Sequence, residues 1–546
     1  MNSKSKHICT VQLQEYFQHK LFKRIIQSSH WSKLEGYIEE DIYKTLEVLK
    51  NNNTSATFFT SGWIAEKHPK LLRKITEHGH ELACIGYFDF SYSDVSQDKF
   101  VSDIRRAKYL IEDATGQAVT GYRTIQKPIE KNRDKFLSLL AEEGFLYDSS
   151  IYYPPVSTQW ISRDKQQLYR DKQSGLWELP LRTVNFGPFH LPVSGGNALR
   201  QYPRLVKNLF WQQNWNETPF ILYFHPWELT DLQPRLTAFD SITSLRMYRN
   251  LGKVTAHLEQ ILSRGDFVSV SNFLEIKQEK YKSKKRKEIL LSSEKIPCNC
   301  NIQGEKELTV IIPCYNETDT IPYLQNNLKS MEQGFGKSLL LKYIFVDDKS
   351  TDDTVNKLQK IFGDNNQVTI IQHKENEGVA GAIKTGLLSA KTELIASIDA
   401  DCSYDPLELI PMINLLDKDT ALVTASPYHK DGSVLGVPEW RLFLSRGLSG
   451  IYKNILTHKF ATYTACFRVY RKSLIKDSIN KWGDFRGIVE LLVRLDLRGR
   501  KIKEFPTTLH SRIFGFSKMK TMKTIQKHLE FLLKFKSIKK EIKNSM

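Results

Sequence analysis

The pattern of apolar and polar residues divides this sequence into two blocks in which strand-like and helix-like stretches alternate. Short apolar runs, typical of strands buried on both faces, are followed by polar residues and then by helical periodicity. A Lys-rich and then polar stretch at 277–305 separates the blocks and is typical of an interdomain linker. Repeated β and α units predict a largely parallel sheet or a barrel in the N-terminal block and a half-sheet that binds a nucleotide in the C-terminal one.

In the C-terminal block, four apolar runs end in polar residues and lead into helical stretches. The fourth run ends abruptly in Asp399-Ala400-Asp401. Ligands of open α/β sheets bind outside the carboxyl ends of the strands, and carboxylates at i and i+2 can hold one hard divalent cation. We therefore expect Asp399 and Asp401 to present a metal to a phosphate ligand; the simpler alternative is that they open a turn before Pro406. Neither GxxxxGK nor GxGxxG is present, which excludes P-loop and dinucleotide folds.

The composition indicates a globular protein with anionic partners. Of its 546 residues, 40% are apolar and 26% are charged, which excludes a disordered chain. The seven cysteines are scattered apart from Cys298 and Cys300, which favours reduced thiols in the cytoplasm. We find no signal peptide and no run of about 20 apolar residues that could span a membrane. The net charge of +18 favours phosphorylated ligands, acidic lipid or nucleic acid, but no motif for nucleic-acid recognition accompanies it.

The N-terminal block resembles a known enzyme family in several motifs. Residues 56–87, together with GYR at 121–123, YDSS at 147–150 and YFHPWEL at 223–229, resemble the polysaccharide deacetylases, and most closely the branch associated with exopolysaccharide export. The resemblance extends over about 11–273 and implies a distorted β/α barrel. It also implies an early acidic pair, which supplies a catalytic base and a metal ligand, and two histidines that complete the metal site.

This sequence departs from the deacetylase pattern at each of those positions. The acidic pair is replaced by Gln12 and Gln14, and the two histidines by Ile85 and Asp89. A neutral amide is a poor ligand for a hydrolytic metal and cannot act as a general base. We therefore predict that residues 1–276 form a deacetylase-like domain without deacetylase chemistry. One alternative is a rebuilt metal site made of Asp89, Glu15 and His225; the domain could also bind glycan or act only as a scaffold.

The C-terminal block contains PCYNE, VDDKSTDDT, NEGVAGA and DAD, in this order. This set resembles the inverting glycosyltransferases of the GT-A fold, and the resemblance covers 308–520. It implies that Asp399 and Asp401 hold Mg or Mn on the diphosphate of a nucleotide sugar, where the metal offsets charge on the leaving group. The residues that it implies for binding the nucleotide sugar are Pro313, Tyr315, Glu317, Asp348, Asn376, Gly378 and Lys384.

Three later segments resemble the branch that includes the dolichyl-phosphate mannosyltransferases. They contain Arg441 and Arg446, then Arg468, and then HSRIFGFSK at 510–518. The resemblance implies a phosphate-binding set for a polyprenyl-phosphate acceptor, in which Arg512 also counts as catalytic: Arg446, Arg468, Arg512, Ser517 and Lys518. Guanidinium groups grip phosphate oxygens bidentately, and an anionic phosphate can attack without a general base. The alternative is that these are solvated surface charges, and the role of Glu490 stays open.

The last 26 residues, 521–546, predict a basic amphipathic helix. Its apolar residues recur at near-helical spacing, among many lysines: Ile525, Leu529, Leu532, Leu533, Phe535 and Ile538. Such a helix can lie on an anionic bilayer, which predicts a cytoplasmic protein that is peripheral on the inner membrane face. The alternative is a helix packed on its own domain with solvated lysines.

Together these observations predict an α/β protein with a distorted β/α barrel at 1–276, a linker at 277–305 and a GT-A mixed α/β domain at 306–520. The predicted function is inverting, metal-dependent transfer of a sugar from a nucleotide-diphosphate donor to a polyprenyl phosphate. The alternatives are transfer to a glycan acceptor in exopolysaccharide synthesis, a bifunctional protein with residual deacetylase activity, and a non-catalytic glycan-binding scaffold.

Overall fold

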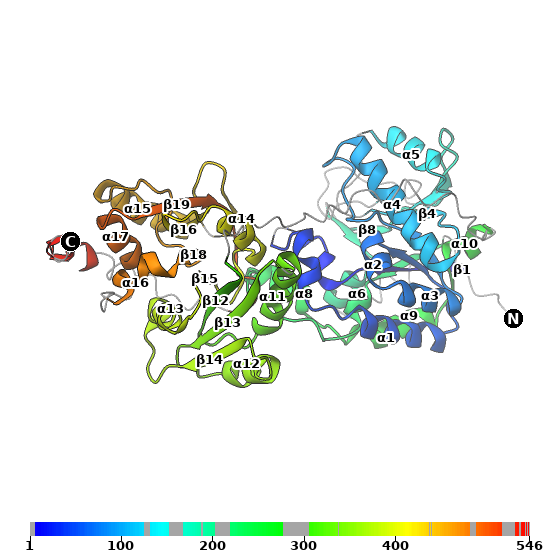
Figure 1. Ribbon diagram of the computed structural model, residues 1–546. Coiled ribbons are helices and arrows are strands. Elements are labelled where there is room, and N and C mark those ends of the chain that lie inside the picture. Colours follow the sequence, from blue (N-terminus) through cyan, green and yellow to red (C-terminus); the bar gives the residue numbers. More distant parts are fainter. Residues whose placement is uncertain are drawn as a thin grey trace. The chain divides into compact units, whose positions relative to one another are not determined.

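The computed structural model divides the chain into two compact units (Figure 1). The N-terminal unit comprises Met1–Lys23, Gly36–Pro234 and Ser241–Glu294, and the C-terminal unit comprises Arg24–Glu35, Arg235–Asp240 and Lys295–Met546. Two short segments from the first half of the sequence therefore fold with the C-terminal unit. The structure describes residues 6–23, 25–124, 132–151, 167–186, 189–202, 219–276, 305–336, 338–435, 437, 439–480, 488–515, 530–533, 535, 537–540, 542 and 544.

The N-terminal unit is built on a curved sheet of nine strands in the order β10-β1-β2-β3-β4-β5-β7-β6, with β11 also paired to β1. Every pairing is parallel except that of β6 with β7. This is the distorted β/α barrel that the sequence predicted, so that prediction is confirmed. The strands are β1 (Lys6–Leu13), β2 (Thr57–Thr60), β3 (Glu81–Cys84), β4 (Gly121–Tyr122), β5 (Tyr147–Asp148), β6 (Tyr169–Arg170), β7 (Trp177–Glu178), β10 (Ile221–Phe224) and β11 (Asp266–Val268).

Helices and a hairpin accompany this sheet, and its inner residues form an apolar core. Ile8 on β1, Phe59 on β2 and Ala83 on β3 belong to one buried cluster. Parallel strands bury both faces, which explains their near-continuous apolar runs. The other elements are α1 (Ile38–Asn51), α2 (Gly62–Lys67), α3 (Pro69–Glu77), α4 (Gln97–Thr115), α5 (Arg133–Glu142), α6 (Gly196–Gln201), α8 (Ser241–Tyr248), α9 (Val254–Leu262), α10 (Val270–Leu274) and the antiparallel hairpin of β8 (Thr183–Phe186) and β9 (Phe189–Pro192).

The C-terminal unit contains a mixed sheet of seven strands in the order β14-β13-β12-β15-β18-β16-β19. The first four are parallel, and β18 runs antiparallel to both of its neighbours, β15 and β16. This is the GT-A mixed α/β domain that the sequence predicted. The strands are β12 (Glu307–Cys314), β13 (Leu340–Asp347), β14 (Val368–Gln372), β15 (Leu394–Ser397), β16 (Thr420–Ser426), β18 (Arg468–Arg471) and β19 (Lys501–Pro506).

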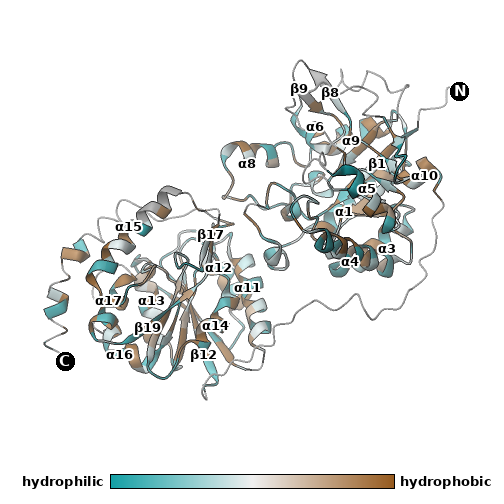
Figure 2. Cartoon of the chain, turned by 90° about the horizontal axis from the view of Figure 1, so that it is seen from above, coloured by the Kyte–Doolittle hydropathy of each residue, from teal (hydrophilic) through white to brown (hydrophobic). Residues whose placement is uncertain are grey.

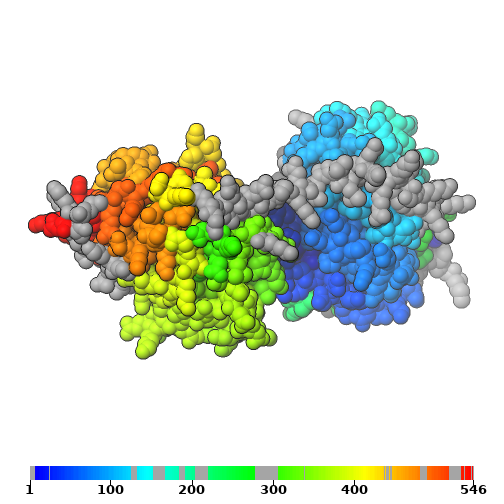
Figure 3. All heavy atoms as spheres, viewed as in Figure 1, coloured from blue at the N-terminus to red at the C-terminus, as the bar shows by residue number. Residues whose placement is uncertain are grey.

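Figure 2 shows both ends of the hydropathy scale along the helices of the C-terminal unit, whereas α17 is buried over Val489–Asp496. In the space-filling view, green, yellow and orange residues from distant parts of the sequence pack side by side in this unit (Figure 3). The helices are α11 (Ile321–Phe335), α12 (Thr354–Phe362), α13 (Gly378–Ser389), α14 (Leu409–Asn414), α15 (Glu439–Ile455), α16 (Lys472–Asn480) and α17 (Val489–Leu497), and the small parallel pair is β17 (Ser433–Leu435) with β20 (Thr508–His510).

The register of the parallel strands decides where the polar loops meet. Cys314, the last residue of β12, lies opposite Asp347, the last residue of β13, and Ile311 lies opposite Ser397, the last residue of β15. The three strands therefore end at one edge of the sheet. The loops that follow them, which hold the predicted nucleotide and metal residues, start from neighbouring positions at this edge.

The described residues between 530 and 544 are largely helical, and most of their apolar side chains are buried or half-buried, whereas Leu533 is 84% exposed. Phe531, Ile538 and Ile542 are buried in the core cluster of the C-terminal unit, and the Phe531 ring lies 6.5 Å from that of Tyr452. This is the alternative that the sequence left open, a helix packed on its own domain; Ile525 and Leu529 lie outside the described residues. Among the described helices, none combines the length and apolar character needed to cross a bilayer.

Gly386 tests the packing of α13 on β12. A Cβ at this position would lie 2.4 Å from Cγ2 of the buried Ile311, so Gly386→Ala should cost about 1–3 kcal/mol of unfolding free energy through overpacking. Gly447→Ala is the matched control, because Gly447 lies exposed on α15 with no atom within 4 Å of the added methyl group; it should gain roughly 0.5–1 kcal/mol. Urea unfolding of the full chain measures both, and equal effects would contradict this packing.

Candidate active site

Three residues that are far apart in the sequence meet at the carboxyl edge of the C-terminal sheet. Arg512 donates through Nε to Oδ2 of Asp401 at 2.7 Å and through Nη1 to Oε1 of Glu317 at 3.0 Å. Asp401 also accepts a hydrogen bond from the backbone N–H of Ser403 at 2.9 Å. Side-chain exposure is 24% for Arg512 and below 10% for both acids, so the three charges are partly withdrawn from water. The structure thus brings together residues from three of the predicted motifs.

Asp399 lies beside this ion-pair network. Burial and the neighbouring carboxylate of Asp401 raise the pKa of Asp399 to about 7, although Arg512 opposes this effect. Two close carboxylates that repel each other form a place where a cation is favourable. Their oxygen atoms are the hard ligands that Mg²⁺ and Mn²⁺ take, so the donor set fits the predicted metal. No group of three or more His, Cys, Asp or Glu side chains that could hold a metal occurs in the described part of the chain.

The two acids at the end of β13 have different roles. The Asp348 carboxylate accepts hydrogen bonds from the backbone N–H groups of Glu377 at 2.8 Å and Gly378 at 2.7 Å, and it contacts Nδ1 of His373 at 2.9 Å. A carboxylate at the N-terminus of a helix satisfies its open N–H groups, so Asp348 holds the start of α13. Asp348 is predicted from the sequence to bind the nucleotide, whereas in the structure both of its carboxylate oxygens accept hydrogen bonds from the loop that begins α13.

Asp347 is the neighbouring acid that the sequence analysis left without a role. Its Oδ2 accepts from the backbone N–H of Ser350 at 3.1 Å, while its Oδ1 is buried and has no hydrogen-bond partner among the described residues. A buried acceptor without a partner costs free energy unless a ligand or water satisfies it. Asp347 therefore offers a free acceptor at the same edge as Asp401. The adjacent acidic pair was the signal in the sequence, but only the contacts distinguish the two residues.

The loop after β12 is tied to the loop after β13. Asn316, at a positive φ of 54°, donates its backbone N–H to Ser350 at 2.8 Å and accepts through Oδ1 from the N–H of Thr351 at 2.6 Å. The backbone N–H of Glu317 donates to Thr354 at 2.7 Å. These bonds hold Glu317 toward Arg512. Among the other residues predicted to bind the nucleotide sugar, the side-chain amide of Asn376 donates to the backbone carbonyl of Asp348. The remaining four are half-buried: Pro313, Tyr315, Gly378 and Lys384.

The predicted acceptor residues do not all meet Arg512. Arg468 on β18 is fully buried, and its guanidinium donates to the carbonyls of Ile488 at 2.9 Å and Tyr463 at 2.8 Å. Arg446 is exposed on α15, with its guanidinium carbon 5.3 Å from the ring centre of Tyr428. Ser517 and Lys518 lie outside the described residues.

Glu490, whose role the sequence left open, forms a buried ion pair with Arg494 at 2.8 Å, one turn further along α17. Both charges lie in the interior of the C-terminal unit, where an ion pair avoids the cost of an isolated buried charge. This contact gives Glu490 a structural role within its own helix.

In the N-terminal unit, a polar network occupies the positions at which the resemblance to deacetylases implies a metal site. The Asp89 carboxylate accepts from Nε2 of Gln14 at 3.1 Å and from Oγ1 of Thr124 at 3.2 Å, and the Asp89 carbonyl accepts from Nζ of Lys23 at 2.7 Å. Amide and hydroxyl donors thus satisfy the carboxylate that a metal would otherwise neutralise. Gln12 is fully buried, and neither polar atom of its side chain has a partner among the described residues.

The three residues of the alternative rebuilt site have separate surroundings. Glu15 accepts hydrogen bonds from the backbone N–H groups of Tyr37 and Ile38, both at 3.2 Å, at the start of α1. Burial raises the pKa of Glu15 to about 8. The ring of His225 lies 5.2 Å from that of Trp227, and its Nδ1 faces Glu228. These contacts engage Glu15 and His225 away from Asp89, so they provide no support for a rebuilt metal site.

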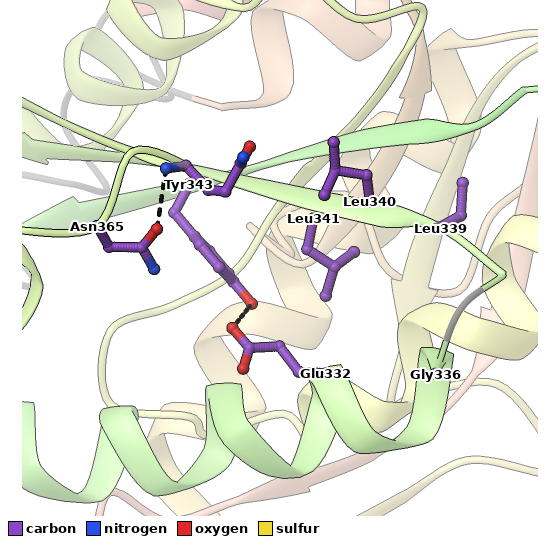
Figure 4. Close-up of a pocket in the computed structure, with 8 residues that line it drawn as sticks. Glu332, Gly336, Leu339, Leu340, Leu341, Tyr343 and Asn365 are labelled. Carbon is purple, nitrogen blue, oxygen red and sulfur yellow. Dashed lines mark hydrogen bonds between the residues drawn. The ribbon is translucent and has the colours of Figure 1, made fainter.

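A pocket in the C-terminal unit lies at the other end of β13 (Figure 4). Its lining includes Leu340, Leu341 and Tyr343 from the beginning of β13 and Glu332 from α11, with Tyr343 donating to Glu332 at 2.8 Å. The acids described above follow the carboxyl end of this strand, at the opposite edge of the sheet. This pocket is therefore separate from the candidate active site.

Comparison with known families agrees with the division of the chain into an N-terminal and a C-terminal unit. Residues 309–479 match the family described as "Glycosyl transferase family 2", and residues 35–145 match the family described as "Polysaccharide deacetylase". Residues 149–275 match a family described as "Domain of unknown function (DUF3473)". The matches confirm both resemblances: a glycosyltransferase family 2 domain in the C-terminal part and a polysaccharide deacetylase domain in the N-terminal part.

The curated relatives match over roughly two fifths of this chain. The dodecaprenyl-phosphate galacturonate synthase of Rhizobium johnstonii is 27% identical over 41% of this chain and 65% of its own length. The dolichol-phosphate mannosyltransferase of Pyrococcus furiosus is 27% identical over 43% of this chain and 65% of its own. The poly-beta-1,6-N-acetyl-D-glucosamine synthase of Staphylococcus aureus is 29% identical over 41% of this chain and 53% of its own. The chain thus spans less than two thirds of each relative.

Among solved structures, a Mycobacterium smegmatis protein described as a polysaccharide deacetylase is 18% identical, with a TM-score of 0.33, covering 52% of this chain and 97% of that one. A mannosyltransferase from Pyrobaculum calidifontis, solved with GDP-Man and Mn²⁺, is 17% identical, with a TM-score of 0.29, covering 42% of this chain and 62% of that one. Both likenesses are weak.

Arg468 and Arg446 form a matched pair that separates a structural arginine from a surface one. Arg468→Met should cost about 2–3 kcal/mol of stability, because it leaves two buried carbonyls without their charged donor. Arg446→Met, on the exposed face of α15, should change stability by no more than about 0.5 kcal/mol. Denaturant unfolding of each variant gives the two numbers. If Arg468→Met left the free energy of unfolding unchanged, Arg468 would again be a candidate for ligand binding.

Proposed function

We propose that the C-terminal unit transfers a sugar, with inversion, from a nucleotide-diphosphate donor to a polyprenyl phosphate. The single observation that supports this most is the convergence of Glu317, Asp401 and Arg512 beside Asp399, at the carboxyl edge of a sheet that matches glycosyltransferase family 2. Such an edge is where open α/β sheets bind phosphorylated ligands. The arrangement supplies both the acids for a divalent cation and a guanidinium for phosphate.

On the donor side, Asp399 and Asp401 would hold Mg²⁺ or Mn²⁺, which when bound supplies Lewis-acid stabilisation of charge on the leaving diphosphate. Asp347 offers its free Oδ1 as an acceptor for the nucleotide, and Asp348 keeps the start of α13 in place. The other residues proposed for the nucleotide sugar are Pro313, Tyr315, Glu317, Asn376, Gly378 and Lys384.

On the acceptor side, an oxygen of the lipid phosphate attacks the anomeric carbon from the face opposite the leaving group. The bond from that carbon to the nucleoside diphosphate breaks, and the configuration inverts. The attacking phosphate is already anionic, so no general base is required. Arg512 lies at the carboxyl edge of the sheet, where it can orient the attacking phosphate, and Ser517 and Lys518 are close to it in sequence. Arg446 is exposed on the surface and could also contact the phosphate, whereas Arg468 makes internal contacts.

The names of the relatives support two acceptors. Two are named as synthases or transferases of a polyprenyl phosphate, and the third as a synthase of a polysaccharide. Transfer to a glycan in exopolysaccharide synthesis is therefore the second candidate function. Comparing radiolabelled sugar transfer to dodecaprenyl phosphate with transfer to an oligosaccharide distinguishes them. A glycan-binding scaffold without activity is the third candidate, and it predicts no transfer to either.

We place the protein in the cytoplasm, peripheral on the inner membrane face, where a polyprenyl phosphate would be reached. The support is the net charge of +18, and the exposed Lys539 and Lys540 on the C-terminal helix. Phe531, Ile538 and Ile542 of this helix are buried in the C-terminal unit and Leu533 is exposed, so contact with an anionic bilayer would be mainly electrostatic and weakened by salt.

Asp401→Asn tests the donor site. Screening nucleotide sugars by thermal shift with MnCl₂ should find at least one that raises the melting temperature of the wild type, and Asp401→Asn should abolish that metal-dependent rise, because it removes one of two metal-binding carboxylates. The control is Asp364→Asn, an exposed acid before β14, which should keep the full rise. Retention of the rise by Asp401→Asn would argue against the proposed metal site.

The N-terminal unit is proposed to be an inactive deacetylase, since Gln14 and Thr124 already satisfy Asp89. Incubating the full chain with N-acetylated chitooligosaccharide and added ZnCl₂ should release no acetate above the rate of buffer. An active zinc-dependent deacetylase run in parallel shows that the assay works. Acetate release that disappears in Asp89→Asn would instead establish the bifunctional alternative.

A further inference from the structure

Two short segments that precede the linker fold with the C-terminal unit, Arg24–Glu35 and Arg235–Asp240. The first contains a 3-10 helix, Ser28–Lys33, which Figure 1 shows in dark blue beside α11. Asn326 on α11 donates its side-chain amide to the carbonyl of Lys33 at 3.1 Å. The deacetylase match begins at residue 35 and the glycosyltransferase match at 309, so neither family match covers this helix.

Lys33 forms an ion pair with the loop that carries the metal-binding acids. Its Nζ lies 2.7 Å from Oδ1 of Asp405, four residues after Asp401, and the Lys33 side chain is only 4% exposed. The same Oδ1 accepts from the backbone N–H of Leu407 at 3.0 Å and so caps the following 3-10 helix, Pro406–Glu408. A buried lysine is costly unless it is paired, so this contact restrains the loop strongly once it forms.

His30, in the same 3-10 helix, packs on the segment that leads to Arg512. Its ring lies 4.7 Å from that of His510 at an angle of 70°. Burial lowers the pKa of His30 to about 4. His30 is therefore neutral near pH 7, and its uncharged ring packs on that of His510. The backbone N–H of His510 donates to the carbonyl of Ser403 at 2.9 Å, and Ser403 in turn donates to Asp401. The 3-10 helix therefore contacts both segments that bring Asp401 and Arg512 together: the loop at Asp405, through Lys33, and the segment at His510, through His30.

The second segment, Arg235–Asp240, contacts the residues that follow Arg512 in the sequence. The hydroxyl of Thr237 donates to the carbonyl of Gly515, and the neighbouring Leu236 is buried. Gly515 has a positive φ of 68°, a conformation that glycine adopts without strain. Arg512 thus lies between two restraints, one at His510 and one at Gly515, and both come from residues that precede the linker.

We propose that these two segments are positioning elements of the transferase site, and that Lys33 and Thr237 set the geometry of Asp401 and Arg512. The proposal rests on the proposed function, and it goes beyond it by making the site depend on residues outside the glycosyltransferase match. Lys33 acts through Asp405 and Thr237 through Gly515. Because small displacements of such groups are costly to binding and catalysis, loss of either restraint weakens metal-dependent nucleotide binding.

The experiment compares Lys33→Met with Lys342→Met in the full chain. Lys342 forms a similar ion pair of 2.8 Å with Glu307, but this pair is more than one third exposed and lies at the amino end of the same sheet. Calorimetric titration with UDP and with GDP, each with MnCl₂, gives the affinity, and transfer assays give KM and kcat. Lys33→Met should weaken metal-dependent nucleotide binding about tenfold and raise the KM of the donor, whereas Lys342→Met should match the wild type.

Thr237→Val is the second variant, because it removes one hydroxyl without leaving a buried charge unpaired. It should weaken the same binding severalfold, with an unchanged circular dichroism spectrum. If the wild type binds nucleotide and both Lys33→Met and Thr237→Val bind equally well, the positioning role is wrong and the proposed function stands. If Lys33→Met does not fold, Thr237→Val alone decides. If the wild type itself binds neither nucleotide with Mn²⁺, both proposals fail.

Discussion

The C-terminal unit depends on one electrostatic constraint, the placing of several acids at one edge of a sheet. Asp399, Asp401 and Glu317 come from loops that follow neighbouring parallel strands, so they are brought close together by the register itself. Their mutual repulsion must be offset. In this structure Arg512 bridges Asp401 and Glu317 and supplies compensating positive charge. A divalent cation on Asp399 and Asp401 and a phosphate on Arg512 would complete the compensation with ligand charges in place of protein ones.

Other residues of the C-terminal unit keep the loops that carry these charges in place. Asp348 fixes the start of α13, Asn316 ties the first two loops together, and Lys33 anchors the loop after Asp401. Each of these residues is polar and sits near the site without being free to bind a ligand through the same atoms. These three residues therefore serve the geometry of the site.

The N-terminal unit shows the opposite outcome of the same physics. At the positions where the resemblance to deacetylases implies a metal site, Gln14 and Thr124 donate hydrogen bonds to the Asp89 carboxylate. Lys23, which donates to the Asp89 carbonyl, adds a positive charge that disfavours a cation there. Gln12, whose side chain has no partner among the residues that the structure describes, remains as a buried polar residue of this unit. The chain thus combines one sheet edge at which several acids converge with another at which a single acid is satisfied by neutral donors.

Much of the outcome was determined by the sequence alone, because apolar runs, polar strand ends and ordered motifs are local properties. They predicted both folds, both family resemblances and the convergence of acids at the edge that Asp399 and Asp401 define. The tertiary structure decided what depends on contacts between distant residues. Asp347, and not Asp348, has an oxygen without a partner among the described residues, Arg468 faces the interior, and Phe531, Ile538 and Ile542 pack into the C-terminal unit. It also placed Ser28–Lys33 with the C-terminal unit. No local pattern contains this information, since burial and hydrogen-bond partners are fixed only when the chain has folded.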